Sequence, residues 1–182
     1  MTGRLFTVVG PSGAGKDTLL ALAQAERPEL ALVRRVITRP EAAGSEDFEG
    51  VSTVEFAKRL AAGAFALHWQ AHGLSYGIPK NELAPLSRGA DVVFNGSRAA
   101  LVAAAAQFPA LVVILVTAPP ALLATRLATR GREDHAEIAA RVSRAALDLP
   151  ANLDCIEVVN DSTPEAGAAR LLAALRPQPA KA

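Results

Sequence analysis

The sequence predicts an α/β fold in which helices wrap a parallel sheet. Strand-like apolar runs alternate with helix-forming segments along the chain. The run Leu111–Thr117 is almost wholly apolar, as in strands that a parallel sheet buries on both faces. With 182 residues, of which 51% are hydrophobic, the chain is long enough to bury one proper core. We therefore expect residues 1–182 to form a single domain, with 176–182 as a flexible tail.

The most informative stretch is the glycine-rich segment 10–16, which lies between the strand-like run Leu5–Val9 and a helix-forming run from Asp17. It matches G-x-x-x-x-G-K, the phosphate-binding P-loop, in the strand–loop–helix context that this pattern requires. Backbone N–H groups would line a polyphosphate, and Lys16 would reach the β- and γ-phosphates of ATP. The residues expected to bind ATP here are Gly10, Pro11, Ser12, Gly13, Ala14, Gly15, Lys16, Asp17 and Thr18.

The position after the lysine departs from the usual pattern. Most P-loops carry Ser or Thr there as a ligand for Mg²⁺, whereas this chain has Asp17, with Thr18 one place later. A carboxylate is also a good ligand for a hard cation. We therefore expect Mg²⁺ as a cofactor, with Asp17 as its protein ligand.

The net charge, the longest apolar run and the cysteine count limit which classes of function the chain can have. The formal net charge is +1, so the overall charge indicates no nucleic-acid partner. The longest apolar run, Ala110–Val116, is too short to cross a bilayer, and we expect a cytoplasmic protein that does not bind membranes. Cys155 is the one cysteine, which excludes an intrachain disulfide, and its apolar neighbours predict a buried core thiol.

The other elements follow from local patterns. Leu30–Ile37 is predicted as a second strand, interrupted by Arg34 and Arg35, and residues 41–51 as an irregular surface segment. The capping box Ser52–Glu55 predicts a helix that ends at Gly63. The further predicted elements are a β-hairpin over 65–78, strands over 91–95, 111–117 and 155–159, and helices over 97–106, 119–129, 136–147 and 164–175.

These motifs together resemble the guanylate-kinase-like nucleotide kinases, P-loop proteins, over nearly the whole chain. The matching segments are 10–16, 38–40, the hairpin region 63–77, 126–132, 138–141 and 160–161. The resemblance implies an acceptor-binding insertion over residues 38–80 and an arginine-rich lid over 126–144. It implies that Arg39 and Tyr76 hold an acceptor phosphate, that Arg126, Arg130 and Arg141 neutralise the transferred γ-phosphate, and that Asn160 and Asp161 lie beside the adenine.

The chain departs from guanylate kinases where those enzymes read guanine. His68 stands in place of a hairpin glutamate, Ala42 in place of a second phosphate-holding arginine, and Asn95 in place of an aspartate. With Arg98, these departures resemble the ribose 1,5-bisphosphate phosphokinases of phosphonate catabolism, which make 5-phosphoribosyl 1-diphosphate (PRPP). A carboxylate facing the second phosphate of such an acceptor would repel it. The acceptor-binding residues that this resemblance implies are Arg39, His68, Tyr76, Asn95 and Arg98.

Two other functions stay open at this point. The chain could be a nucleoside monophosphate kinase, such as a guanylate kinase, that reads its base in another way. It could also be a non-catalytic interaction module, although such modules usually lose the P-loop lysine and the lid arginines that this chain keeps. For His68 the alternative to acceptor binding is a hydrogen-bonded position in the core, where Trp69 is also expected.

Overall fold

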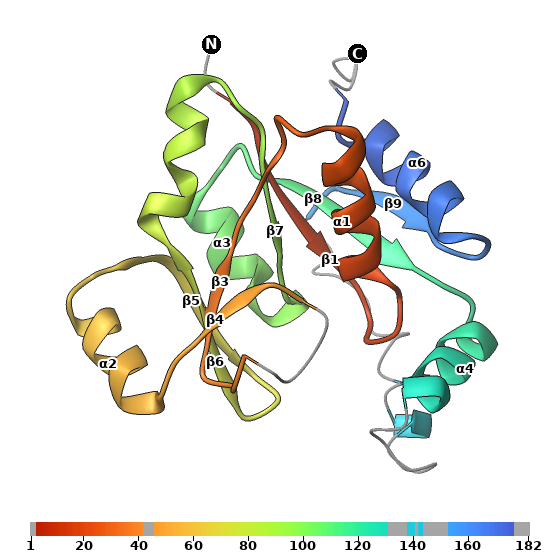
Figure 1. The fold of residues 1–182 in the computed structure, drawn as a ribbon, viewed down its shortest axis with the longest axis horizontal. Helices are drawn as coiled ribbons and strands as arrows, with labels where there is room; N and C mark the ends of the chain where they lie inside the picture. Colours follow the sequence, from red (N-terminus) through yellow and green to blue (C-terminus); the bar gives the residue numbers. More distant parts are fainter. Residues whose placement is uncertain (1–2, 42–45, 131–137, 141, 144–152, 177–182) are drawn as a thin grey trace. The chain divides into compact units, whose positions relative to one another are not determined.

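The computed structural model describes residues 3–41, 46–130, 138–140, 142–143 and 153–176. Their strands form a five-stranded parallel sheet of order β2-β7-β1-β8-β9 and a four-stranded sheet of order β4-β3-β6-β5 (Figure 1). The strands are Leu5–Val9 (β1), Ala31–Leu32 (β2), Arg35–Ile37 (β3), Phe48–Gly50 (β4), Phe65–Ala71 (β5), Leu74–Pro79 (β6), Val92–Asn95 (β7), Val112–Thr117 (β8) and Cys155–Val159 (β9).

Helices connect most of these strands. The α-helices are Lys16–Glu26 (α1), Thr53–Ala61 (α2), Leu101–Gln107 (α3), Pro120–Arg130 (α4) and Pro164–Ala174 (α6), and the 3₁₀ helices are Lys80–Arg88 (η1) and Arg98–Ala100 (η2). The chain divides into two compact units. The first consists of residues 1–7 and 28–112, and the second of residues 8–27 and 113–182.

Leu30–Ile37 was predicted as one strand. It forms two strands, β2 and β3, in two different sheets, so the prediction of a single strand was wrong. β2 pairs in parallel with β7, and Val33 N–H extends that ladder to the Val93 carbonyl at 2.9 Å. The next N–H, that of Arg34, donates instead to Glu82 Oε2 at 3.0 Å. The chain therefore leaves one ladder at Arg34 and joins the other sheet at β3.

Residues 41–51 also differ from the prediction of an irregular segment. Phe48–Gly50 is β4, which pairs in parallel with β3, and the Phe48 side chain is buried. Residues 42–45 lie outside the described part of the chain. Three residues are too few for an alternating pattern to be read in the sequence, which is why this strand escaped prediction.

The helix start at Ser52 and the hairpin are confirmed, although the Glu55 side chain pairs with Arg59 rather than completing the capping box. Ser52 Oγ accepts a hydrogen bond from Glu55 N–H at 3.1 Å at the start of α2. β5 and β6 pair antiparallel, and the two turn residues His72 and Gly73 both have positive φ, 52° and 73°. Trp69 is buried and stacks on Tyr76 with ring centroids 5.3 Å apart, so its predicted place in the core is confirmed.

The second unit holds the segment 10–16, with α1 beside α6 (Figure 1). Val113 and Ile114 of β8 are both buried, as expected of a strand covered on both faces. Cys155 corrects a prediction, because it is exposed rather than a core thiol. It opens β9, the edge strand of the sheet, where Val158 alone of the five residues is buried.

Two predicted segments extend beyond the described residues. Of the helix predicted over 136–147, residues 138–140 and 142–143 are helical, and the others lie outside the described part, as does 177–182 in the predicted tail. Within the described ranges, no helix combines the length and apolar character that a membrane span needs.

The cap of α2 gives the first testable prediction. Replacing Ser52 with Ala removes the hydrogen bond to Glu55 N–H, and we expect the free energy of unfolding to fall by about 1 kcal/mol. Val54→Ala, at a position 78% exposed on the same helix, is the matched control and should change stability by less than about 0.5 kcal/mol. Chemical denaturation of both variants measures this difference, and equal unfolding midpoints would contradict it.

Candidate active site

Three glycines with positive φ shape the segment 10–16. Gly10, Gly13 and Gly15 have φ of 150°, 86° and 89°, a region that side chains disfavour. A Cβ on Gly10 would lie 2.1 Å from the Val116 carbonyl oxygen, so no other residue fits at that position. Gly13 faces Leu127 of α4. The predicted P-loop is thus held closely between β8 and α4.

Lys16 begins α1 immediately after this loop. Its Nζ donates hydrogen bonds to the carbonyl oxygens of Gly10 at 2.9 Å and Pro11 at 3.0 Å. Gly15 occupies the N-cap of α1 and makes no side-chain cap, and the N-terminus of a helix is a favourable place for an anion. An ammonium group over the loop and the helix N-terminus together suit a polyphosphate.

Asn160 connects this loop to the ends of two strands. Its side chain is buried, and its Nδ2 donates to the Ala14 carbonyl at 2.7 Å. Its backbone N–H donates to the Thr117 carbonyl, also at 2.7 Å. The space is tight, since a Cβ on Gly15 would lie 2.6 Å from Nδ2 and one on Gly167 would lie 2.7 Å from Oδ1. The geometry therefore makes Asn160 a brace for the loop backbone.

Asp161, the neighbouring residue with the same predicted role, lies in a different environment. Its side chain is exposed and forms an ion pair with Arg170, Nη1 to Oδ1 at 2.6 Å. The hydrogen bond from Arg170 holds the pKa of the Asp161 carboxyl below its usual value. Of the two residues predicted to lie beside the adenine, one braces the loop and the other is exposed to solvent.

Arg126 is the lid arginine whose side chain the structure describes in the second unit. Its Nη1 would lie 3.9 Å from a Cβ on Gly15, so α4 brings the guanidinium against the loop. This nitrogen is buried and has no hydrogen-bond partner among the described residues. A buried guanidinium nitrogen needs an acceptor, and a phosphate oxygen is a suitable one. Arg130 is the last residue of α4, and Arg141 lies outside the described residues.

Asp17 lies in the first turn of α1, partly buried, whereas Thr18 is exposed. Among the described residues, no group of three or more His, Cys, Asp or Glu gathers to hold a metal ion. Mg²⁺ commonly uses one or two protein carboxylates and takes its other oxygens from substrate phosphates and water. A single carboxylate beside the phosphate loop therefore fits this ion.

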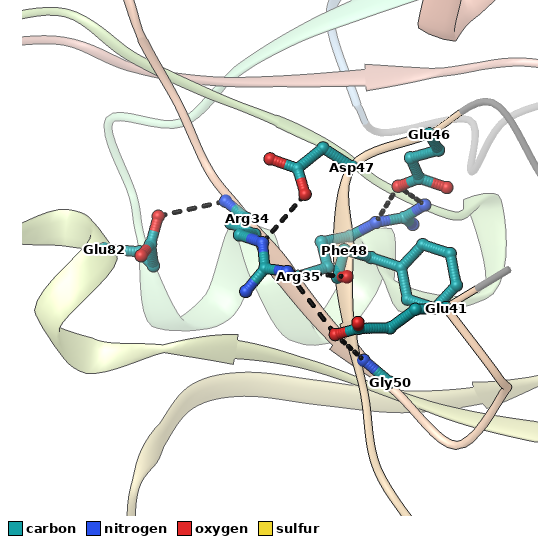
Figure 2. Close-up of polar contacts among 8 residues, drawn as sticks. All are labelled: Arg34, Arg35, Glu41, Glu46, Asp47, Phe48, Gly50 and Glu82. Atoms are coloured by element: carbon teal, nitrogen blue, oxygen red, sulfur yellow. Dashed lines mark hydrogen bonds and ion pairs between the residues drawn. The ribbon is translucent and has the colours of Figure 1, made fainter.

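Arg35 is the buried cation of the first unit, and the sequence interpretation did not assign it to the site. It is 6% exposed, and its Nη1 donates to the Asn95 carbonyl at 2.8 Å. Its Nε donates to Glu46 Oε1 at 2.9 Å, and its Nη2 contacts the same oxygen (Figure 2). The sequence could have indicated this role, because Arg35 lies in an apolar strand and a buried arginine needs a carboxylate partner.

Arg39 and Tyr76 lie beside this ion pair. The Arg39 guanidinium stacks over the Phe48 ring at 4.4 Å, and its Nη2 lies 4.0 Å from Glu46 Oε2. The Arg39 Nε is buried and has no hydrogen-bond partner in the described ranges. The Tyr76 ring centroid is 5.3 Å from Arg35 Cζ. Burial raises the pKa of Tyr76, while the charges of the two arginines act in the opposite direction.

His68 does not join these residues. Tyr76 is in register with Trp69, and His68 is in register with Gly77. Adjacent residues of a strand point to opposite faces, so His68 lies on the face opposite Tyr76. His68 is also exposed, which excludes the alternative of a buried core histidine. The β5 residues that share the Tyr76 face are apolar: Leu67, Trp69 and Ala71.

Asn95 and Arg98 follow one another at the end of β7. Asn95 is buried, and its carbonyl accepts from Arg35. Arg98 opens η2 three residues later and is partly buried, and this burial lowers its pKa. The first unit therefore brings Arg39, Tyr76 and Asn95 to the Arg35–Glu46 pair, with Arg98 in the turn that follows.

The brace at Asn160 gives the second prediction. Asn160→Asp keeps the shape but replaces the Nδ2 donor with an oxygen facing the Ala14 carbonyl, so we expect about tenfold weaker binding of a nucleoside triphosphate. Isothermal titration calorimetry measures this affinity directly. Glu165→Gln, an exposed change in the first turn of α6, is the control and should bind like wild type. Unchanged affinity in Asn160→Asp would contradict the bracing role.

Comparison with known proteins places these features in a family. No protein-family model matches the chain. A ribose 1,5-bisphosphate phosphokinase of Acidiphilium cryptum is 51% identical over 177 residues, which are 96% of this chain and 93% of that protein. The corresponding protein of Rhizobium etli is 47% identical over 176 residues, covering 95% and 89%.

Longer relatives and solved structures agree with this. A bifunctional ribose 1,5-bisphosphokinase-thymidine phosphorylase of Cupriavidus necator is 50% identical over 176 residues, and the match covers 96% of this chain but 29% of that protein. The crystal structure of guanylate kinase from Anaplasma phagocytophilum has a TM-score of 0.67 at 19% identity, covering 96% of this chain and 85% of that one, which shows the shared fold. The chain belongs to the ribose 1,5-bisphosphate phosphokinase family.

Proposed function

We propose that this chain transfers the γ-phosphoryl group of ATP to the 1-phosphate of ribose 1,5-bisphosphate and so forms 5-phospho-α-D-ribose 1-diphosphate. Relatives of nearly the same length carry this acceptor in their names. The structural observation that carries the proposal is the cluster that Arg39 and Tyr76 form with the Arg35–Glu46 ion pair in the first unit. Arg39 Nε is buried without a hydrogen-bond partner among the described residues, whereas Leu67 and Trp69, on the same face of the hairpin as Tyr76, are packed in the core.

This cluster favours a phosphorylated sugar over a nucleotide base. A guanine edge carries several donors and acceptors, and each one buried without a partner costs about 1–3 kcal/mol. The neighbouring Leu67 and Trp69 are buried in the core and therefore offer a base edge no hydrogen-bond partner. The Arg39 guanidinium, by contrast, suits phosphate oxygens, since arginine binds them through paired N–H donors.

The residues that would bind ATP, the phosphate donor, belong to the second unit. The amides of segment 10–15 and the N-terminus of α1 would hold the β- and γ-phosphates, with Lys16 neutralising their charge. The unsatisfied Arg126 Nη1 would donate to an equatorial oxygen of the γ-phosphate. Arg130 and Arg141 keep the lid role that the family resemblance implies.

The transfer itself needs little acid–base chemistry. An oxygen of the 1-phosphate attacks the γ-phosphorus, and the bond from that phosphorus to the β,γ-bridging oxygen breaks, so the electron pair leaves with ADP. The attacking oxygen is already anionic, and no proton must be removed from it. Catalysis then rests on positioning and on charge stabilisation by Lys16 and the arginines. The Asp17 carboxylate would hold Mg²⁺, which would supply further charge neutralisation.

An acceptor panel tests the proposed function. ATP consumption is measured with ribose 1,5-bisphosphate, GMP, dGMP and UMP, and the product is identified by mass. We expect turnover with ribose 1,5-bisphosphate, and a decrease in kcat on the order of a hundredfold or more in Lys16→Ala. Lys58→Ala, an exposed lysine of α2, is the control. Preference for GMP, or no turnover with any acceptor, would reject the proposal.

The metal assignment has its own test. Asp17→Ser removes the carboxylate that we assign to Mg²⁺, so the concentration of Mg²⁺ that gives half-maximal turnover should rise by about tenfold or more. Glu26→Gln changes an exposed carboxylate at the other end of the same helix and should leave the Mg²⁺ dependence unchanged. A Mg²⁺ titration that is identical for Asp17→Ser and wild type would remove this assignment.

A further inference from the structure

The carboxylate of Glu46 is distinct among the acidic groups around β3 and β4. Glu41 is 58% exposed and Asp47 is 81% exposed, and both pair with Arg34. Glu46 is 18% exposed and pairs with Arg35 instead (Figure 2). Its other oxygen lies near Arg39. It is therefore the acidic side chain of this group that lies within the candidate acceptor site.

Glu46 is also held in a defined orientation. Arg35 Nε and Nη2 both bind Oε1, which fixes that oxygen. Arg35 is itself fixed by its bond to the Asn95 carbonyl at 2.8 Å and by its burial. The other oxygen, Oε2, lies 4.0 Å from Arg39 Nη2, beyond hydrogen-bond distance. One oxygen is thus engaged, and the second lies beside Arg39 at a fixed place.

A carboxylate at this position would weaken the binding of a phosphate group by itself. It cancels one of the two guanidinium charges that an acceptor phosphate would meet, and it repels the phosphate itself. A fixed carboxylate oxygen is, however, a strong acceptor for a hydroxyl group. A pentose bisphosphate carries both features, because its 2-hydroxyl lies on the carbon next to the one that bears the 1-phosphate.

We propose that Glu46 determines the specificity for ribose by accepting a hydrogen bond from the 2-hydroxyl of the acceptor at Oε2, while Arg39 holds the adjacent phosphate. This inference rests on the proposed function, since it names a hydroxyl of the proposed acceptor. Arg35 acts through Glu46 and is a positioning residue. The buried and otherwise unsatisfied Arg39 Nε is the donor available to the phosphate on the same side.

The other role open to Glu46 is that of a substitute anion, which pairs with the arginines until the substrate phosphate displaces it. Displacement would break two hydrogen bonds to an arginine that is 6% exposed and leave a buried guanidinium to be satisfied again. The geometry therefore favours a carboxylate that stays in place. The two roles also predict opposite effects of neutralising Glu46, which makes them separable.

The test compares kcat/KM for ribose 1,5-bisphosphate with that for 2-deoxyribose 1,5-bisphosphate. Wild type should prefer ribose by at least about tenfold, because a site built to bind a hydroxyl rejects the analogue that lacks it. Glu46→Gln keeps the shape and an oxygen for Arg35, and we expect it to reduce this preference by about tenfold through poorer use of ribose. Glu46→Asp keeps the charge but withdraws the oxygen, and it should reduce the preference as well.

Asp47→Asn is the matched control, because it neutralises the next residue, which pairs with Arg34. Its preference should equal that of wild type, and thermal melting shows that each variant is folded. An unchanged preference in both Glu46 variants overturns the inference and leaves the function standing. A lower KM for both sugars in Glu46→Gln also overturns it and identifies a substitute anion. Absence of wild-type turnover with ribose 1,5-bisphosphate removes the function and the inference together.

Discussion

The phosphate loop depends on a steric constraint more than on any single attraction. Gly10, Gly13 and Gly15 adopt positive φ, and each is in close contact with a different neighbour: the β8 backbone, α4 and Asn160. A side chain at Gly10 or Gly15 would collide with an atom at 2.1 or 2.6 Å. Glycine is therefore required at these positions, because it alone combines positive φ with such close neighbours. The hydrogen bonds from Lys16 and Asn160 to loop carbonyl groups then stabilise this conformation.

In the first unit, the buried guanidinium of Arg35 is the group that fixes the neighbouring residues. Arg35 could not be buried in β3 without compensation, and it obtains it from the Glu46 carboxylate and the Asn95 carbonyl. These two partners come from different strands or loops, so the ion pair fixes the end of β7 with respect to the segment before β4. Tyr76 packs over the same guanidinium. The Arg35–Glu46 ion pair thereby orders the groups of the proposed acceptor site.

The parts that the sequence predicted are those in which a local pattern is sufficient. Segment 10–16, the Ser52 cap and the hairpin turn each depend on a few adjacent residues, and each is confirmed. The bracing role of Asn160 and the division of segment 30–37 depend on contacts between distant residues, such as the bond from Arg34 N–H to Glu82. The role of His68 was implied by the family resemblance, which sets it in place of a hairpin glutamate, whereas the register of β5 and β6 puts it on the face opposite Tyr76.

The exposure of Cys155 has a practical consequence. It is the only thiol in 182 residues, and it lies at the start of an edge strand in the second unit. A maleimide dye or a spin label would therefore attach at one defined position without any engineered cysteine. Partial burial and the nearby Glu157 and Asp154 raise the pKa of the thiol, so alkylation proceeds faster in mildly alkaline buffer than at neutral pH. The natural chain thus already carries a single attachment point for spectroscopy of its nucleotide-binding half.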